Sequence, residues 1–307
     1  PAGPAVLRSG ATELAVSPNE EEVAFVVRGE VFVASVEHGT TKRVTNTPVQ
    51  ERMLTWSKDG KSLYYASERG QSWGIYKSSL VRDGEERFYG ATALKEEPVL
   101  VSEGEENFQP LMSPDGKKLA YIKNRDAIWI FDVATKQSKK IVGEEFNYSY
   151  SDGDITFAWS PDGKWLTFDY LPWKRWIGEI GVANAETGEI TNMSESGYQE
   201  SVPLWGREGR VLYFHSDRFG KRSHGGWGGE DDIMGLYLTQ ESLDRANLSE
   251  EDYDVLKKKE DEKENPGKAE EDKKDDKKKS KEDKKKDKEK KKKEKAEKEK
   301  AEEEKPA

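Results

Sequence analysis

The residues with the greatest capacity for chemistry gather in one glycine-rich stretch, residues 214–232. This stretch carries a carboxylate, a guanidinium, an imidazole and an indole, at Asp217, Arg218, His224 and Trp227. A guanidinium can bind a carboxylate through two parallel hydrogen bonds, and an indole offers a flat surface for stacking. The stretch therefore predicts a loop that could hold a peptide, with Arg218 on a peptide carboxylate and Trp227 as the stacking surface.

The same loop also has a purely structural interpretation. Asp217 and Arg218 could tie the end of a strand to its neighbour, while the glycines allow the chain a tight path. Ser223 and His224 are adjacent, but a nucleophile and its base are brought together by the fold and not by sequence neighbourhood. We therefore assign no catalytic residue to this stretch.

A second candidate surface combines residues 148–154 with residues 169–176. Its candidates for lining a substrate channel are Asp169 and Tyr170. The carboxylates here and in residues 230–232 lack the regular ligand spacing and the closing bidentate carboxylate of a calcium loop. We accordingly predict no metal and no cofactor, and the aromatic residues are expected to pack between strands and to form the rim of a channel.

The search for catalytic signatures in the sequence favours a binding or scaffold role. The sequence has no His-Glu-x-x-His zinc motif and no phosphate-binding glycine loop. It contains three histidines and no cysteine, which excludes thiol catalysis and disulfides.

A repeating unit must position these candidate residues. Ser-Pro-Asp-Gly or a close variant begins at Ser17, Ser57, Ser113 and Ser160, and residues 204–210 form a degraded fifth copy. With Gly206 as the fifth equivalent position, the spacings are 40, 56, 47 and 46 residues. The proline, aspartate and glycine each favour a tight turn. A period of this length is typical of one propeller blade with loop insertions.

The residues on either side of each turn predict four antiparallel strands per unit. Apolar, β-branched and aromatic stretches such as residues 119–122 and 128–133 are typical of the second and third strands. More polar stretches, residues 42–45, 139–142 and 190–193, suit an outer edge strand. We therefore predict an all-β fold over residues 1–240, an incomplete β-propeller of four-stranded blades.

Three segments depart from the repeat. Residues 81–98 form a charged insertion, predicted as a long solvated loop or extended hairpin, with a docking loop for a neighbouring domain as the alternative. Residues 241–256 predict a short helical exit segment in which Ser249 caps a helix that begins with acidic residues. Residues 257–307 predict a Lys/Glu/Asp-rich linker, either disordered or a solvated helix, that serves as a spacer.

The charge is unevenly distributed along the chain. Of 51 basic and 61 acidic residues, residues 257–307 hold 23 and 19, which leaves 28 basic and 42 acidic residues in positions 1–256, a net charge of −14. An acidic surface argues against nucleic acid as a partner. Because no apolar run approaches about 18 residues, we predict no membrane span.

The Ser-Pro-Asp-Gly repeats resemble those of TolB-like propellers, and further stretches narrow the resemblance. These are residues 9–13, 41–48, 147–154, 216–218 and 223–228. Together they resemble the propeller region of bacterial tricorn-type serine peptidases over residues 7–256. The resemblance implies a large multidomain enzyme in which propellers feed peptides to a separate catalytic domain, with a PDZ-like module nearby.

For this chain, the resemblance implies a non-catalytic propeller segment that gates or docks peptides or unfolded polypeptides. The catalytic Ser and His of the family have no counterpart here, so we interpret the chain as an internal fragment without an active site of its own. The expected partners are the PDZ-like and catalytic domains of the same chain, and a homo-oligomer stays open. The expected compartment is the cytoplasm, with the periplasm or cell envelope as the alternative.

Two other functions are compatible with the same fold. One is a TolB-like protein-interaction scaffold without enzymatic activity, whose acidic face binds a protein. The other is the propeller of a prolyl-oligopeptidase-like enzyme. Function in such proteins depends on what is attached to the propeller.

Overall fold

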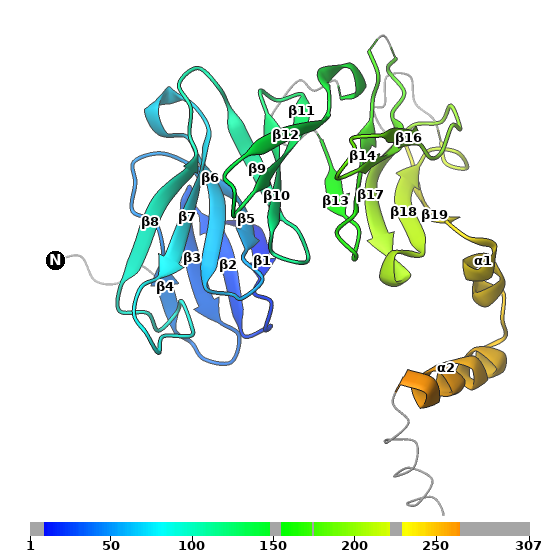
Figure 1. The fold of residues 1–307 in the computed structure, drawn as a ribbon, viewed down its shortest axis with the longest axis horizontal. Coiled ribbons are helices and arrows are strands. Elements are labelled where there is room, and N and C mark those ends of the chain that lie inside the picture. The colour runs from blue at the N-terminus through cyan, green and yellow to red at the C-terminus, as the bar shows by residue number, and fades with distance from the viewer. Residues whose placement is uncertain (1–8, 148–154, 174, 222–228, 265–307) are drawn as a thin grey trace, which may run out of the picture. The chain divides into compact units, whose positions relative to one another are not determined.

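The computed structural model describes residues 9–147, 155–173, 175–221 and 229–264, and Figure 1 shows how their elements are arranged. Of the residues singled out from the sequence, His224 and Trp227 lie outside this set, as do residues 148–154. The chain divides into two units, Pro1–Leu238 and Thr239–Ala307.

The first unit consists of five antiparallel sheets, called blades 1 to 5 here, in which strands consecutive in the chain are neighbours. Blade 1 contains β1 (Ala11–Val16), β2 (Glu22–Val27), β3 (Glu30–Ser35) and β4 (Thr41–Arg43), and blade 2 contains β5 (Glu51–Trp56), β6 (Ser62–Ser67), β7 (Gly74–Leu80) and β8 (Leu94–Leu100). Blade 3 contains β9 (Asn107–Met112), β10 (Lys118–Lys123), β11 (Ala127–Asp132) and β12 (Ser138–Val142), and blade 4 contains β13 (Phe157–Trp159), β14 (Trp165–Tyr170), β15 (Glu179–Asn184) and β16 (Ile190–Asn192). Blade 5 has three strands, β17 (Glu200–Gly206), β18 (Val211–Ser216) and β19 (Asp232–Tyr237). Short 3-10 helices lie at Arg69–Gln71, Glu144–Phe146 and Arg207–Gly209.

The repeated turn joins the first and second strands of a blade, as the sequence predicts. In blade 3, the Ser113 hydroxyl donates to Asp115 Oδ1 at 2.6 Å and accepts from the Lys118 N–H at 2.9 Å. Gly116 completes the turn with φ of +76°. Blades 2 and 4 repeat this arrangement at Ser57 and Ser160. The prediction of an all-β fold built from blades is confirmed.

The cores lie between consecutive blades. Blades 1 and 2 share a cluster that includes Val31, Val33, Trp56 and Tyr65. Blades 4 and 5 share a cluster of Ile180, Val182, Leu212 and Phe214. Each sheet therefore buries its faces against its neighbours in the sequence, as expected for a propeller. The outward faces of the two terminal blades stay exposed at Leu14, Val16, Leu204 and Ile233.

An indole hydrogen bond ties three of the blades to the blade before them. The tryptophan that directly precedes the repeat position donates its Nε1–H to a carbonyl on the first strand of the preceding blade. The pairs are Trp56 with Ala15 at 2.9 Å, Trp159 with Leu111 at 3.0 Å, and Trp205 with Ala158 at 3.1 Å. This bond explains why tryptophan recurs beside the turn.

The charged insertion, expected as a solvated loop or an extended hairpin, links the antiparallel strands β7 and β8 of blade 2, which fits a hairpin. Its last residues, from Leu94, belong to β8, and its centre is anchored by Phe88. Phe88 is fully buried and packs edge-on against Trp56, with ring centroids 5.1 Å apart. The solvated-loop alternative is therefore wrong for the centre of the insertion, because the Phe88 ring is buried although charged residues surround it in the sequence.

The second unit contains α1 (Gln240–Ala246) and α2 (Glu250–Glu264). Ser249 caps α2, because its hydroxyl accepts the Asp252 N–H at 3.2 Å. Arg245 joins the two helices through two hydrogen bonds of 2.6 Å to the carboxylate of Glu260. Within the described residues, no helix has the length and apolar character needed to cross a bilayer.

Candidate functional site

The first strands of four blades carry a bulge at one repeated position. The pairing register of β1, β5, β9 and β17 with the strand that follows shifts by one residue near the start of each strand. In three of them, the residue four positions before the repeat serine or glycine has positive φ: Met53 at 61°, Gln109 at 54° and Val202 at 56°. A bulge bends its strand and redirects side chains, and bulges are common beside functional sites.

The bulged residues of blades 1 to 3 line a cavity, which we call the bulge cavity, and Val202 of blade 5 is not among its lining residues. It has a volume of about 420 Å³ and is bounded by residues of the first strands of blades 1 to 4. These residues are Glu13, Leu14, Met53, Leu54, Gln109, Pro110, Leu111 and Phe157. The wall is mostly apolar, with one carboxylate and one amide as its polar groups.

Contacts between blades hold these bulges in place. Glu13 of blade 1 accepts a hydrogen bond from the Met53 N–H and lies 3.4 Å from Arg52 Nε. Gln109 Nε2 donates to the Ile155 carbonyl at 2.8 Å, and within the described residues the buried Gln109 Oε1 has no hydrogen-bond donor. Leaving a buried acceptor unsatisfied costs roughly 1–3 kcal/mol.

A second, larger cavity lies between blades 1 and 2, and we call it the polar cavity. Its volume is about 1140 Å³, and it shares Glu13 with the bulge cavity. Its other lining residues are Thr12, Val26, Arg28, Gly29, Pro48, Val49, Gln50, Arg52, Glu68, Gly70 and Gln71. The two cavities therefore offer an apolar wall next to a region with charges of both signs.

Asp169, a predicted channel residue, accepts a hydrogen bond from the bulged residue of β17. Its Oδ2 accepts the Thr156 N–H at 2.9 Å and its Oδ1 accepts the Val202 N–H at 2.8 Å, which joins blade 4 to blade 5. Burial raises the pKa of Asp169 above its ordinary value, although both hydrogen bonds favour the charged form. Both carboxylate oxygens of Asp169 thus accept backbone N–H groups, and Glu13 likewise accepts the backbone N–H of Met53.

The next predicted channel residue, Tyr170, is half-buried and packs locally. Its ring stacks on Phe146 with centroids 5.8 Å apart. Leu171 N–H donates to the Phe146 carbonyl at 3.0 Å, which fixes this segment. Neither Asp169 nor Tyr170 lines the two cavities.

Asp217 and Arg218 lie at the end of β18 in blade 5. Asp217 Oδ1 accepts the Gln199 N–H at 3.0 Å, and the Asp217 N–H donates to the Gln199 carbonyl at 3.1 Å. The Arg218 guanidinium lies over the Tyr198 ring, 5.4 Å from its centroid, and near Phe219. Asp217 and Arg218 thus both contact the segment that precedes β17, and their contact with a substrate stays a prediction.

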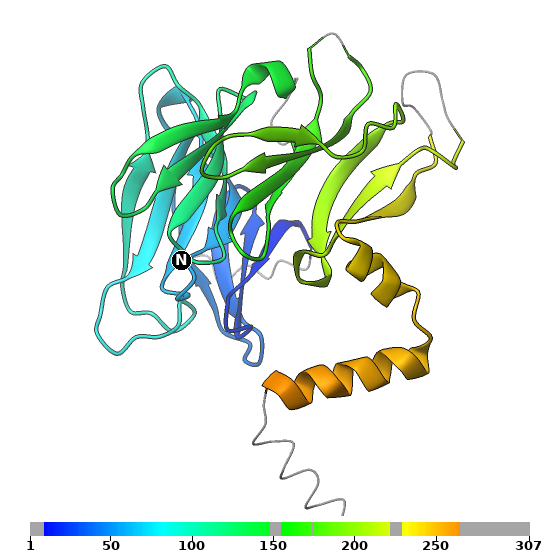
Figure 2. The ribbon, with the colours of Figure 1, turned by 45° about the vertical axis from the view of Figure 1, so that its right-hand side comes forward.

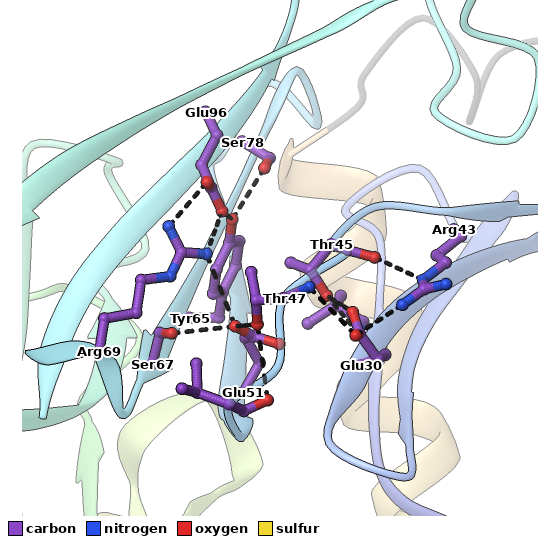
Figure 3. A network of polar contacts seen from close by, with 12 residues as sticks. Glu30, Arg43, Thr45, Thr47, Glu51, Tyr65, Ser67, Arg69, Ser78 and Glu96 are labelled. Carbon is purple, nitrogen blue, oxygen red and sulfur yellow. Dashed lines mark hydrogen bonds and ion pairs between the residues drawn. The ribbon is translucent and has the colours of Figure 1, made fainter. Parts of the chain in front are cut away.

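The same sequence pattern has a structural role in blade 2. Ser67-Glu68-Arg69 matches Ser216-Asp217-Arg218, and Arg69 binds the Glu96 carboxylate through two hydrogen bonds of 2.7 and 2.8 Å (Figure 3). These bonds raise the pKa of Arg69 and lower the pKa of Glu96. Glu96 belongs to β8, the fourth strand, and the described sheet of blade 5 has three strands.

The structure also reveals residues that the sequence analysis missed. The cavity residues Glu13, Met53 and Gln109 carry no motif, and their shared distance from the repeat serine is the only sequence signal. A Gly-x-Ser-x-Gly pattern is also present at residues 70–74. Its Ser72 lies on a connection between two strands and donates to the Glu105 carbonyl at 2.7 Å. A nucleophile elbow requires a strand followed by a helix, so this match carries no catalytic role.

Among the residues that the structure describes, no cluster of three or more His, Asp or Glu side chains could hold a metal ion.

Comparison with known proteins points to one kind of relative. No family model matches the chain. A Sulfurisphaera tokodaii protein named "Putative Tricorn-like protease C-terminal subunit" is 33% identical over 107 residues, 35% of this chain and 12% of the relative. A "Tricorn protease homolog" of Saccharolobus solfataricus is 26% identical over 107 residues, 35% of this chain and 9% of the relative. The matched segment is thus a small part of each relative.

Solved structures share the fold. The crystal structure of the tricorn protease matches 80% of this chain and 25% of its own, with a TM-score of 0.53 and 14% identity. TolB from Acinetobacter baumannii matches 75% of this chain and 52% of its own, with a TM-score of 0.50 and 16% identity. The chain is therefore a tricorn-like or TolB-like propeller segment in its fold.

Proposed function

We propose that this chain is a non-catalytic propeller segment of a tricorn-type serine peptidase, which docks or gates extended peptides for a separate catalytic domain. The observation that carries the proposal is the bulge cavity, because one bulge position on consecutive blades builds a single wall. The blades of a propeller surround a central channel, and we assign this wall of first-strand residues to that channel.

The chemistry of the wall suits an extended peptide. Leu54 and Leu111 offer apolar surface for side chains, and Glu13 and Gln109 place a carboxylate and an amide on the same wall. An extended peptide carries free backbone N–H and C=O groups that can bond such side chains, whereas the exterior of a folded protein has few free N–H groups. The charged groups of the neighbouring polar cavity, Arg28 and Glu68, suit peptide termini of either sign.

The names of the relatives support the peptidase part of the proposal, since two of them are named as tricorn-like proteases. The bacterial origin, the serine nucleophile, and catalytic and PDZ-like domains elsewhere in the same chain belong to this proposal. A cytoplasmic location is proposed with it, and the periplasm or cell envelope is the alternative.

Peptide binding to the chain is the direct test. We expect the anisotropy of a labelled, unstructured peptide of about ten residues, which extends to roughly 30 Å, to rise on addition of the chain. Met53→Asn should weaken this binding about tenfold, because the apolar Met side chain is worth roughly 1.5–3 kcal/mol when buried and asparagine tolerates positive φ. Val36→Asn, at an exposed site outside both cavities, is the matched control.

Equal affinity in the wild type and Met53→Asn would overturn the proposed docking site. The chain alone should leave the peptide uncleaved.

The alternative function is a TolB-like interaction scaffold. The acidic charge of residues 1–256 and the fold similarity to TolB favour it. A stoichiometric complex with a folded protein that weakens in high salt and is unchanged by Met53→Asn would support the scaffold instead.

A further inference from the structure

Blade 5 differs from the other four blades at its outer edge. The other sheets have four strands, whereas the described sheet of blade 5 ends with β19. After β19 the chain enters the helices α1 and α2. Half of the backbone N–H and C=O groups of an edge strand point away from its neighbour, so the outer edge of β19 is unpaired within the described residues.

The first residue of the third strand is acidic in blades 1, 4 and 5. Glu30, Glu179 and Asp232 occupy equivalent positions, because each pairs with the last residue of the second strand of its blade. The three acidic residues can therefore be compared directly.

In blades 1 and 4, this acidic residue binds the last residue of the fourth strand. Arg43 Nη2 donates to Glu30 Oε1 at 2.6 Å (Figure 3), and Asn192 Nδ2 donates to Glu179. The partners correspond, since Arg43 pairs with the third residue of β3 and Asn192 pairs with the third residue of β15.

The residues after the fourth strand continue the same pattern. The hydroxyls of Thr45 and Ser194, two positions beyond Arg43 and Asn192, accept the N–H of the second residue of the third strand. These bonds are 2.9 Å from Val31 and 3.1 Å from Ile180. The intervening Val44 and Met193 return N–H bonds of 2.8 and 2.7 Å to the Val31 and Ile180 carbonyls.

In blade 5, the third strand carries the acidic residue and the apolar residue of this pattern, and the described residues hold no fourth strand to bind them. Asp232 and Ile233 stand where Glu30 and Val31 stand in blade 1. Val31 and Ile180 are fully buried, whereas Ile233 is 75% exposed, because neither a fourth strand nor a following blade covers it in the described part of the chain. Exposed Glu230 and Asp231 add negative charge at the same end of β19.

We propose that the outer edge of β19 binds an extended polypeptide segment of a partner, which adds antiparallel as the fourth strand of blade 5. The segment carries an Arg or Asn, then an apolar residue, then a Thr or Ser. The Arg or Asn side chain donates to the Asp232 carboxylate, and the backbone N–H of the apolar residue donates to the Ile233 carbonyl. The hydroxyl of the Thr or Ser accepts the Ile233 N–H. Strand addition of this kind is a known mode of peptide recognition.

A peptide that copies residues 40–46, Thr-Thr-Lys-Arg-Val-Thr-Asn, is the probe. We expect it to slow hydrogen–deuterium exchange of the amides of β19 in the full chain, and to leave the amides of β3 unaffected because β4 already covers them. A peptide with Ala in place of Arg and Val in place of the following Thr should bind at least tenfold more weakly.

Variants of the chain test the contact with Asp232. Asp232→Asn should weaken binding of the probe about tenfold, and Asp231→Asn, one position away in the same acidic run, should change it by less than threefold. In Asp232→Lys, a probe with Glu in place of Arg should bind better than the original probe. Both sites are exposed, and circular dichroism would show that the three variants fold.

The proposal is overturned if the probe leaves β19 exchange unchanged or if Asp231→Asn has the same effect as Asp232→Asn. It is also overturned if the chain alone dimerises in light scattering with β19 already protected, because a second copy would then occupy the edge. This inference does not rest on the proposed function: protection of the bulge cavity, with β19 unaffected, would support peptide docking and reject strand addition.

Discussion

At the scale of single residues, three carboxylates of this protein fix backbone geometry. Glu13 and Asp169 accept the N–H groups of bulged residues in the following blade, and Asp115 accepts from the turn that begins with Ser113. Such groups are costly to leave unsatisfied when buried. Carboxylates in a propeller sequence are therefore poor evidence for catalysis unless their backbone roles have first been excluded.

Asp115 gives a prediction for the dependence of stability on pH. The Ser113 hydroxyl, and then the Lys117 N–H, lower the pKa of Asp115. A folded pKa below the unfolded value of about 3.9 means that this contribution to stability is present above that value and is lost as the pH falls through the folded pKa. In urea unfolding between pH 7 and 3, Asp115→Asn should lose less stability than the wild type.

The control is Glu103→Gln, at an exposed site, which should follow the wild-type profile. Parallel profiles for the wild type and Asp115→Asn would contradict the assignment.

At the scale of elements, the blade is held to its neighbour by apolar packing and by one indole hydrogen bond. Trp56, Trp159 and Trp205 each donate to the blade before them. In blade 3 the equivalent residue is Met112, and its N–H instead donates to the Thr55 hydroxyl at 3.2 Å. The residue directly before the repeat position therefore joins adjacent blades either by an indole hydrogen bond or by a backbone hydrogen bond.

Removing one indole donor should weaken a single junction. Trp205→Phe keeps the aromatic ring but leaves the Ala158 carbonyl without this donor, and we expect the free energy of unfolding to fall by about 1 kcal/mol. Trp165→Phe is the matched control, because its partly exposed indole makes no hydrogen bond within the described residues. Chemical denaturation measures both, and equal losses would argue against a role for the Nε1–H bond.

The sequence allowed prediction of the elements whose causes are local. The Ser-Pro-Asp-Gly turns follow from residues that bond within the turn, so the strands around them could be placed. The bulges at Met53 and Val202 could not, because their N–H partners, Glu13 and Asp169, lie in another blade and valine rarely adopts positive φ. Phe88 was missed for the same reason, since the Trp56 ring that buries it is far away in the sequence.

At the scale of the whole first unit, stability should vary along the chain. Each blade packs on its sequence neighbours, as in other repeat proteins. Figure 2 shows the ribbon of this unit from a second side. The central blades are covered on both faces, whereas blades 1 and 5 carry exposed apolar residues, Leu14 and Ile233, on their outer faces.

We therefore expect a gradient in amide hydrogen exchange. The amides of β10 and β14 should exchange at least about tenfold more slowly than those of β2 and β18, because local opening costs less where one sheet face is uncovered. Mass spectrometry of the exchanged chain would measure this. Uniform protection of all five second strands would contradict the gradient and would indicate that the unit unfolds in a single step.

The indole bonds also give the array of blades a direction. In all three pairs the donor lies on the later blade and the acceptor on the earlier one. Blade 5 therefore ends with the acceptor position, Leu204, and blade 1 begins with Val16 where the donor would stand. A contact that reuses this bond can therefore form only at blade 5, where an indole on an added blade would meet the Leu204 carbonyl, because the Val16 side chain has no N–H to donate.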